Sequence, residues 1–320
     1  MVKQKIRSSS SSQPVSSLAK VREWYGMFQL LRESAKSLRP ENFSPLIDEV
    51  EGWVETWRRH QILNAKKEIS VLEIGFGAKP RRALALQALG HKVTAVDLDW
   101  PVRAYRDLPN VLRTNGVERF AKSLFRHACF DRDENKVFLK RLAQIDPSYH
   151  VDYGALYVGD ASSEEFWQDR PGPYDMIVST DVFEHIPLEN LDKLTRYMKQ
   201  NLAPTGIAII TPNVFTGICG GHDLEWRPDK ANLEFSWNYA PWGHLRGLGA
   251  EVNTYLNKAR RRDYVSIFSR YFKIIEDTAV RGRLGERWLS GDLRLELAQF
   301  DDYELFSNNV KFVLVSRHDD

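Results

Sequence analysis

Acidic side chains and glycines recur where apolar segments of this chain end. Glu73, Gly75 and Gly77 lie in the stretch Val-Leu-Glu-Ile-Gly-Phe-Gly. Asp97 ends the run Val-Thr-Ala-Val-Asp, and Asp160 follows another glycine. Because glycine has no Cβ, the backbone can turn sharply and approach a ligand closely, while carboxylates accept hydrogen bonds from hydroxyl, amino and cationic groups. This combination favours a site for a polar ligand that carries hydroxyl or cationic groups.

Histidines follow two of the later apolar segments and could carry proton transfer. His185 lies in the run Val-Phe-Glu-His-Ile, His222 and Asp223 follow two glycines, and His244 lies in the run Trp-Gly-His-Leu-Arg. Imidazole titrates near neutral pH and often serves as a general base. A histidine in a loop is also often a surface or hydrogen-bonding residue, so both interpretations stay open for each. The two cysteines form no metal-binding pattern, and we expect no metal ion.

Short apolar segments separated by helical patterns position these residues. Five such segments are predicted strands, at 69–74, 91–97, 155–158, 174–180 and 207–211. Strand–helix–strand units with short turns produce parallel strands joined by right-handed crossovers. The sequence therefore predicts an open, doubly wound α/β sheet, and ligands of such sheets bind beyond the carboxyl ends of the strands. The acids at 73, 97, 160 and 181 would converge there.

The remaining segments are assigned to a cap, two final strands and insertions. Helical periodicity over 21–38 and 45–60 predicts two amphipathic helices, which either pack on the main domain or cap a ligand site. We divide the chain into a disordered tail at 1–17, a helical cap at 18–66 and an α/β domain at 67–320 that contains insertions. The insertions are expected near 101–150, 213–251 and 281–309, further helices at 254–270 and 287–300, and final strands of a mostly parallel seven-stranded sheet at 271–277 and 310–316.

Composition and charge argue against several functions. The formal net charge of the 320 residues is only +2, which gives no case for binding nucleic acid. No apolar run approaches the roughly 20 residues of a membrane span, and the basic, serine-rich start has no apolar core typical of a secretory signal. Because two cysteines make no disulfide framework, we expect a cytoplasmic protein. The sequence does not indicate an oligomeric state.

Taken in order, these motifs resemble the class I S-adenosylmethionine-dependent methyltransferases. The stretch 71–77 is similar to the family's first motif, 93–97 to its second-strand motif, and 159–161 to the segment that contacts adenine. The stretches 174–178 with 183–186 and 202–211 resemble the motifs at its fourth and fifth strands. The resemblance covers residues 69–211. It implies a Rossmann-like fold with a reversed final hairpin, methyltransferase activity, and S-adenosyl-L-methionine as cofactor.

The resemblance also assigns a cofactor site. Asp97 would accept hydrogen bonds from the ribose hydroxyls, Asp160 would accept from the adenine amino group, and Glu73 would serve the cationic amino-acid end. The complete set implied comprises Glu73, Gly75, Phe76, Gly77, Asp97, Leu98, Asp160, Ala161, Thr180 and Asp181. The chain departs from the family where Lys79 stands in place of a frequent third glycine.

Two other functions share this fold and stay open. A nicotinamide dehydrogenase would carry G-x-G-x-x-G, but the position of its third glycine is Pro80. A non-catalytic protein could bind the same ligand without turnover, because a fold alone does not establish activity.

The methyl acceptor is expected to be a small molecule, sugar or glycan that is methylated on oxygen. A hydroxyl acceptor needs a base, and the candidates are the three histidines at 185, 222 and 244, with Asp181 and Asp223 as partners. The aromatic side chains of this region would contact a flat or sugar-like acceptor, fill a small satellite core, or do both; they are Trp226, Trp237, Tyr239 and Trp242. The arginine run 260–262 is interpreted as a solvated helix face. Protein methylation stays an alternative.

Overall fold

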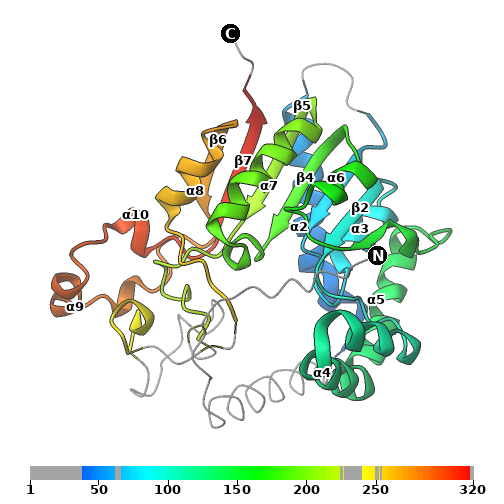
Figure 1. Cartoon of the computed structure of the whole chain (residues 1–320), viewed down its shortest axis with the longest axis horizontal. Helices are drawn as coiled ribbons and strands as arrows, with labels where there is room; N and C mark the ends of the chain where they lie inside the picture. The colour runs from blue at the N-terminus through cyan, green and yellow to red at the C-terminus, as the bar shows by residue number, and fades with distance from the viewer. Residues whose placement is uncertain are drawn as a thin grey trace, which may run out of the picture.

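One seven-stranded sheet organises the computed structural model (Figure 1), which describes residues 38–61, 66–223, 226, 240–248, 252 and 254–317. The strands are β1 (Ser70–Ile74), β2 (Lys92–Asp97), β3 (Leu156–Val158), β4 (Tyr174–Thr180), β5 (Leu202–Thr211), β6 (Phe272–Ala279) and β7 (Val310–Ser316). Their order across the sheet is β3-β2-β1-β4-β5-β7-β6. Strands β1 to β5 pair in parallel, and β7 is antiparallel to both β5 and β6. The predicted sheet with its reversed final hairpin is confirmed.

The central strands follow directly from their apolar runs. β4 and β7 have the predicted bounds, and every residue of β4 before Thr180 is buried. A parallel strand that is covered on both faces reads as a continuous apolar segment, which makes its limits visible in the sequence. β5 begins earlier than predicted, at Leu202, where it pairs with Tyr174 before a register shift.

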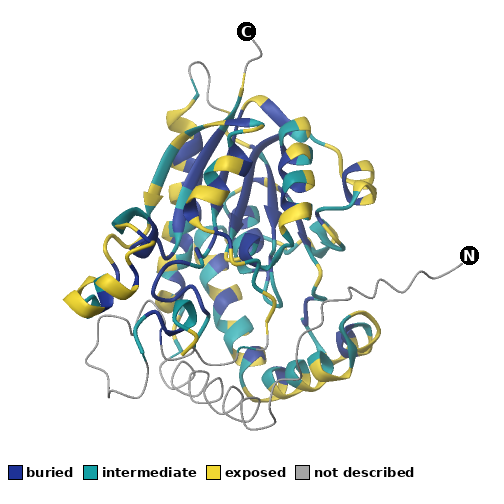
Figure 2. Cartoon of the chain, turned by 60° about the vertical axis from the view of Figure 1, so that its left-hand side comes forward, coloured by how far each residue is buried: buried dark blue, intermediate teal, exposed yellow. Residues whose placement is uncertain are grey.

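Helices cover both faces of the sheet, and Figure 2 shows buried residues concentrated in the strands and in the inward helix faces. On one face lie α2 (Ser44–Arg59), α3 (Arg81–Ala88) and α5 (Arg132–Ile145). On the other lie α6 (Glu164–Asp169), α7 (Leu188–Asn201) and α8 (Arg261–Phe268). The sheet is therefore the middle of three layers.

The helix α2 belongs to one of these layers. Its buried Val50, Trp53 and Trp57 pack in the same core as Val71 and Ile209 of the sheet. Just beyond its end, the side chain at position 61 donates a hydrogen bond of 3.0 Å to a carbonyl near the start of β5. This favours the packed-helix interpretation over a cap across the ligand edge. The predicted tail at 1–17 and the first helix, except its last residue, lie outside the described residues.

Two insertions flank the carboxyl edge of the parallel strands. After β2 come α4 (Leu108–Arg126), which is kinked at Gly116, a π-helical turn (His127–Asp131) and α5. Between β6 and β7 lie a short 3-10 helix (Glu286–Trp288), α9 (Gly291–Glu296) and α10 (Asp302–Leu305). The single helix predicted over 287–300 is therefore wrong in extent. In Figure 1 the carboxyl ends of β1, β2 and β4 point downward, between α4 and the α9–α10 region.

The helix predicted over 254–270 is also wrong in extent, because α8 begins only at Arg261. Lys258 has a φ of 58°, which no helix accommodates. The side-chain N–H groups of Asn257 instead donate hydrogen bonds to the carbonyls of Phe183 and Ile186, each at 2.8 Å. The segment before α8 is thus used to hold the turn that follows β4.

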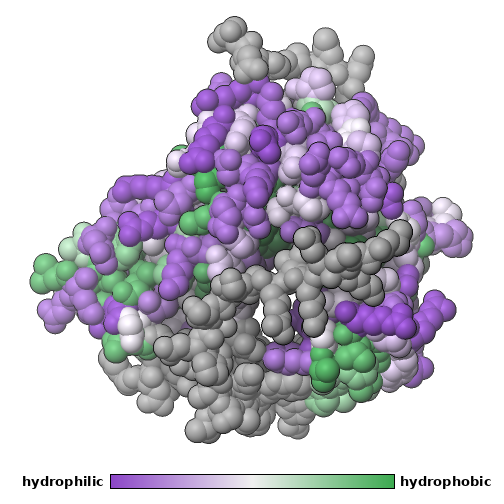
Figure 3. Space-filling model, in the orientation of Figure 1, coloured by the Kyte–Doolittle hydropathy of each residue, from purple (hydrophilic) through white to green (hydrophobic). Residues whose placement is uncertain are grey.

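The face shown in Figure 3 is mostly hydrophilic, with apolar patches over α4 and, on the left, over the α9 region. Exposed side chains on α4 include Leu112, Val117 and Phe125. Within the described ranges, no helix combines the length and the apolar character needed to cross a bilayer.

Candidate functional site

The turn between β1 and α3 brings backbone close to the predicted cofactor position. Gly75 and Gly77 have φ values of 86° and 64°, a left-handed conformation that side chains rarely adopt. A Cβ at Gly75 would lie 2.0 Å from a methyl group of Val182, whereas nothing lies within 4 Å of a Cβ at Gly77. Phe76, between them, is buried in the core beneath α3, so only its backbone can face a ligand.

Glu73 supports this turn from within the sheet. Its side chain is 3% exposed, and its carboxylate accepts a hydrogen bond from the backbone N–H of Ala83 in the first turn of α3. Its Oε2 atom has no hydrogen-bond partner in the described part of the chain. Burial raises the pKa of Glu73 to about 7, against the opposing charge of Arg82. A cationic group placed at the turn would therefore stabilise the ionised form.

Asp97 closes the other side of the turn at the end of β2. Its Oδ2 accepts from the N–H of Gly77 and its Oδ1 from the N–H of Asp99, both at 2.7 Å. Burial raises the pKa of Asp97 to about 6, although the backbone N–H groups of Gly77 and Leu98 and the charge of Arg119 oppose the rise. A carboxylate has about four acceptor positions, so each oxygen keeps one for a further donor. This fits a ligand with two neighbouring hydroxyls, as ribose has.

The predicted adenine-contacting residues lie next along the same edge. Asp160 is exposed, and its Oδ1 accepts from the N–H and the hydroxyl of Ser162 at 2.8 and 2.7 Å, which leaves Oδ2 for a ligand. Leu98 is exposed and can pack against a flat ring. Ala161 is buried, and its carbonyl accepts from Trp167 Nε1 at 2.8 Å.

At the end of β4, Thr180 and Asp181 complete the predicted set. The hydroxyl of Thr180 is buried without a hydrogen-bond partner among the described residues. Asp181 has a φ of 55°, and its carboxylate accepts from Asn309 Nδ2 at 2.6 Å. Strained backbone of this kind persists where surrounding structure holds it. All ten residues of the predicted cofactor set thus lie at or beside the carboxyl edge of the sheet, and their role in binding the cofactor stays a prediction.

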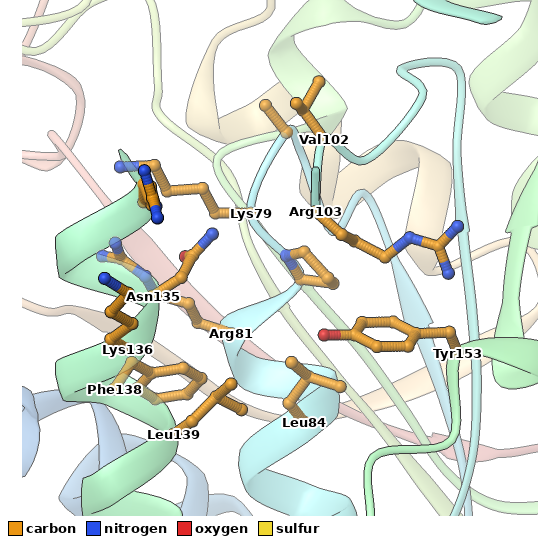
Figure 4. Close-up of a pocket in the computed structure, with 13 residues that line it drawn as sticks. Lys79, Arg81, Leu84, Val102, Arg103, Asn135, Lys136, Phe138, Leu139 and Tyr153 are labelled. Atoms are coloured by element: carbon orange, nitrogen blue, oxygen red, sulfur yellow. The ribbon is translucent and has the colours of Figure 1, made fainter. Parts of the chain in front are cut away.

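Lys79 has a structural partner that the sequence did not reveal. Its Nζ lies 2.6 Å from Asp131 Oδ1 and also contacts Glu134, while Arg81 pairs with the same Glu134 at 2.7 Å. The turn is thereby fastened to the insertion. Beside these pairs, a cavity of about 220 Å³ lies between α3 and α5 and is lined by Leu84, Phe138 and Tyr153, among others (Figure 4). Its lining includes none of the predicted cofactor residues.

A second polar cluster lies directly after β4, in the 3-10 turn Phe183–His185. Glu184 is 3% exposed, and neither carboxylate oxygen has a well-formed hydrogen bond within the described residues. His222 Nε2 lies 3.8 Å and His185 Nε2 4.0 Å from Glu184 Oε1. Burial and then the charge of Asp181 raise the pKa of Glu184 to about 8, only partly offset by the backbone N–H groups of Glu184 and Asn213.

The turn that carries Glu184 and His185 is held from two sides. The carbonyl of Tyr255 lies 2.9 Å from His185 Nδ1. A carbonyl can only accept, so Nδ1 carries the proton and Nε2 keeps its lone pair. The N–H of Asn257 donates to the carbonyl of Glu184 at 2.9 Å, in addition to its side-chain bonds to the same turn.

His222 reaches this cluster from the loop after β5. It has a φ of 54°, and the preceding glycines are tightly packed: a Cβ at Gly220 would lie 2.3 Å from the carbonyl oxygen of Phe215. The imidazole rings of His185 and His222 are nearly perpendicular, with centroids 5.1 Å apart. Burial, with the neighbouring His185 and His244, lowers the pKa of His222 to about 4, so its imidazole is neutral at physiological pH.

The other predicted catalytic residues lie close by but are engaged differently. His244 Nε2 lies 2.7 Å from the carbonyl oxygen of Phe215, so this nitrogen is a donor and cannot accept a proton. Asp223 interacts electrostatically with His244. The structure therefore groups His185 and His222 with Glu184, whereas His244 and Asp223 stabilise the loop that carries His222. Glu184 was absent from the predicted site, although it directly precedes His185 in the sequence.

Two sequence interpretations of this region are resolved by burial. Trp226 and Trp242 are 4% and 0% exposed and belong to a satellite core with residues of α9 and α10, so they do not line an acceptor site. Arg261 is 7% exposed and pairs with Asp277 at 2.8 Å. The arginine run is therefore not simply a solvated helix face. Trp237 and Tyr239 lie outside the described residues.

The comparisons with known proteins address the class to which this fold and site belong. A family model described as a methyltransferase domain matches residues 54–238. Because the match spans more than half of the chain, the chain belongs to this methyltransferase-domain family, and S-adenosylmethionine is its cofactor. A comparison with curated protein sequences found no match.

Similar solved structures include three methyltransferases of low identity. One is an S-adenosylmethionine-dependent methyltransferase from Clostridium acetobutylicum, 12% identical over 93% of this chain and 100% of that chain, with a TM-score of 0.45. A TehB-like methyltransferase from Corynebacterium glutamicum is 14% identical over 94% of this chain and 100% of that one, with a TM-score of 0.38. Phosphoethanolamine N-methyltransferase 2 from Haemonchus contortus is 18% identical over 85% of this chain and 53% of that one, with a TM-score of 0.42.

Proposed function

We propose that the protein methylates a hydroxyl group of a small molecule, sugar or glycan. The observation that carries this proposal is the cluster of the buried Glu184 with the half-buried His185 and His222, beside the cofactor turn. Within the described residues, His222 Nε2 has no hydrogen-bond partner. Val182 packs against Gly75, and Glu184 follows two residues later, so the cluster adjoins the part of the turn next to Glu73. A methyl acceptor has to reach this end of the cofactor, where Glu73 would face the cationic group.

The chemistry of a hydroxyl acceptor matches the side chains present. S-adenosylmethionine supplies an electrophilic methyl group on a sulfonium. The acceptor oxygen forms a bond to the methyl carbon while the carbon–sulfur bond breaks and leaves its electron pair on sulfur. The hydroxyl proton must leave, and His222 Nε2, which has no hydrogen-bond partner among the described residues, would receive it. The resulting imidazolium, 3.8 Å from Glu184 Oε1, would in turn favour the ionised form of that carboxyl. His185, fixed by the carbonyl of Tyr255, would orient the acceptor.

The test is turnover of full-length protein with S-adenosylmethionine on matched panels of acceptors. One panel holds sugars, sugar nucleotides and hydroxylated metabolites, and the other holds amines and peptides. We expect methylation in the first panel, and we expect His222→Ala to lower turnover at least about 100-fold, a usual contribution of a general base. Binding of S-adenosylmethionine, measured by calorimetry, should stay unchanged in this variant.

The matched control is His150→Ala, because His150 is exposed and lines a depression at the amino ends of β2 and β4, away from the site. It should turn over like the unmodified protein. Methylation confined to amines or peptides would contradict the proposal. Full activity of His222→Ala would remove this residue from the reaction.

A further inference from the structure

The cluster after β4 has the composition of a metal site as well as of a proton-transfer site. One carboxylate oxygen of Glu184 and one ring nitrogen each of His185 and His222 all lie within 4.8 Å of one another. Ligand atoms bound at about 2.0–2.2 Å around one ion lie roughly 3.0–3.6 Å apart. The Glu184–His222 and Glu184–His185 separations are 3.8 and 4.0 Å, so small side-chain rotations would close the set around an ion.

The electrostatics of Glu184 provide an independent observation. Its two oxygens are each almost completely shielded from solvent and lack a well-formed hydrogen bond within the described residues. A buried carboxylate without a partner is costly, and proteins pair such groups or use them to coordinate metals. No Lys or Arg pairs with Glu184 among the described residues. Both imidazoles lie within 4.0 Å of its Oε1, and the negative charge of Asp181 also acts on it. The buried nitrogen His222 Nε2 likewise has no hydrogen-bond partner in the described part of the chain.

The surroundings of His185 match those of a metal ligand. A ligating histidine usually donates its second ring N–H to a carbonyl or carboxylate, which fixes the ring and directs the free lone pair toward the ion. His185 Nδ1 has this relationship with the carbonyl of Tyr255 at 2.9 Å. Asn257 fixes the rest of the turn through the carbonyls of Phe183, Glu184 and Ile186. The His185 ring and the backbone that carries Glu184 are thus held in place without the ion.

We propose that Glu184, His185 and His222 bind one divalent transition-metal ion, which in turn binds the hydroxyl of the methyl acceptor. Two imidazoles and one carboxylate suit Zn²⁺, Mn²⁺, Co²⁺ or Fe²⁺ better than a hard ion held by oxygen alone. Three protein ligands leave a position open, as in catalytic sites. The expectation of no metal ion rested on cysteine spacing, which cannot reveal ligands 37 residues apart.

The inference rests on the proposed hydroxyl acceptor and changes how its proton leaves. A bound cation polarises the O–H bond and lowers the pKa of the hydroxyl, so the proton can pass to solvent water. The acceptor oxygen then forms its bond to the methyl carbon with the same electron balance as before. In this arrangement His222 acts through coordination instead of receiving the proton.

The test measures metal binding separately from turnover. Full-length protein is stripped with EDTA, dialysed into metal-free buffer and titrated with Zn²⁺ by calorimetry, and with Mn²⁺ by the loss of its free-ion electron paramagnetic resonance signal. We expect one ion per chain. Glu184→Gln and His222→Ala should each weaken binding at least about 100-fold, since even partners of the ligands cost 10–100-fold. His150→Ala and Glu189→Gln, at exposed positions, are the matched controls and should bind normally.

Turnover of the stripped protein on hydroxyl acceptors should fall at least tenfold and return with added metal. Circular dichroism shows whether each variant is folded. If His222→Ala does not fold, the nearly isosteric Glu184→Gln still tests the proposal. Absence of stoichiometric binding, or equal binding by Glu184→Gln, would overturn the metal proposal. If the stripped protein still methylates hydroxyls, the proposed function survives without the ion. One bound ion with methylation of amines alone would instead overturn the proposed acceptor class.

Discussion

The ammonium group of Lys79 lies 2.6 Å from a carboxylate oxygen of Asp131, so the glycine turn is tied to the insertion that follows β2. Replacing Lys79 by Met leaves Asp131 and Glu134 with fewer cationic partners in a mostly buried position. Because Arg81 and Arg126 also contact these acids, we expect the free energy of unfolding to fall by about 1–3 kcal/mol, less than for an isolated buried pair. Chemical denaturation would measure it.

The control for this prediction is Lys136→Met on the same insertion. Lys136 pairs with Asp133 at 3.3 Å, and both side chains are well exposed. Exposed pairs contribute about 0–1 kcal/mol, so the control should change little. Equal losses in the two variants would show that the Lys79 pairs do not anchor the insertion.

Gly75→Ala should destabilise the protein and disturb the cofactor site. The added Cβ would lie 2.0 Å from Val182 and would have to adopt a φ of 86°. We expect the free energy of unfolding, measured by denaturation, to fall by about 2–4 kcal/mol from overpacking and backbone strain together. Gly77→Ala has open space around its Cβ. Its free energy of unfolding should therefore fall by about 1 kcal/mol, from backbone strain alone.

Adding Val182→Ala to Gly75→Ala separates the steric part of the loss from the backbone part. The double variant should recover the overpacking component only, which a double-mutant cycle detects as coupling. Strict additivity of the two substitutions would contradict the contact.

Asp97→Ala should remove binding of S-adenosylmethionine. The substitution deletes the carboxylate that we propose accepts from two ribose hydroxyls, and hydrogen bonds to charged groups are worth about 1.5–3 kcal/mol each. We expect affinity measured by calorimetry to fall at least about 100-fold. Asp133→Ala, at an exposed position, should bind normally. Unchanged affinity in Asp97→Ala would refute the proposed ribose contact.

Glu73 should make stability depend on pH. Its pKa is about 7 in the folded protein against 4.5 as the ordinary value. The folded state therefore binds more protons than the unfolded state between these values, so stability falls as pH rises from about 5 to 7. At about 1.4 kcal/mol per pKa unit, the loss is about 3 kcal/mol.

Glu73→Gln isolates this effect because it removes the titrating group and keeps the shape. Urea denaturation without cofactor should show the variant gaining up to about 3 kcal/mol relative to the unmodified protein between pH 5 and 8. Glu189→Gln, at an exposed position, should show no such trend. A pH-independent difference for Glu73→Gln would contradict the assignment.

The strand pattern, and the edge of the sheet at which the predicted cofactor residues lie, could be predicted from the sequence. The apolar runs of β4 and β7 are covered on both faces, and residues at the ends of parallel strands must meet at one edge. That rule predicts Asp97, Asp160 and Asp181 at this edge, and each lies at or just beyond the end of a parallel strand. The bounds of α8 and α9 could not be predicted, because the helical periodicity of the sequence continues beyond each helix. Before α8, for example, the side chain of Asn257 makes tertiary hydrogen bonds.

The sequence by itself determined the sheet, its family and the edge where the predicted cofactor residues gather, because strands that are covered on both faces consist of short, continuous apolar runs. Only the tertiary structure decided the partners of Lys79, the burial of Trp242 and the meeting of Glu184 with His222. These relationships join residues that are far apart in the chain, so no local pattern specifies them. The Glu184 carboxylate is shielded from solvent, and its pKa is raised, only when the loops after β4 and β5 have packed together.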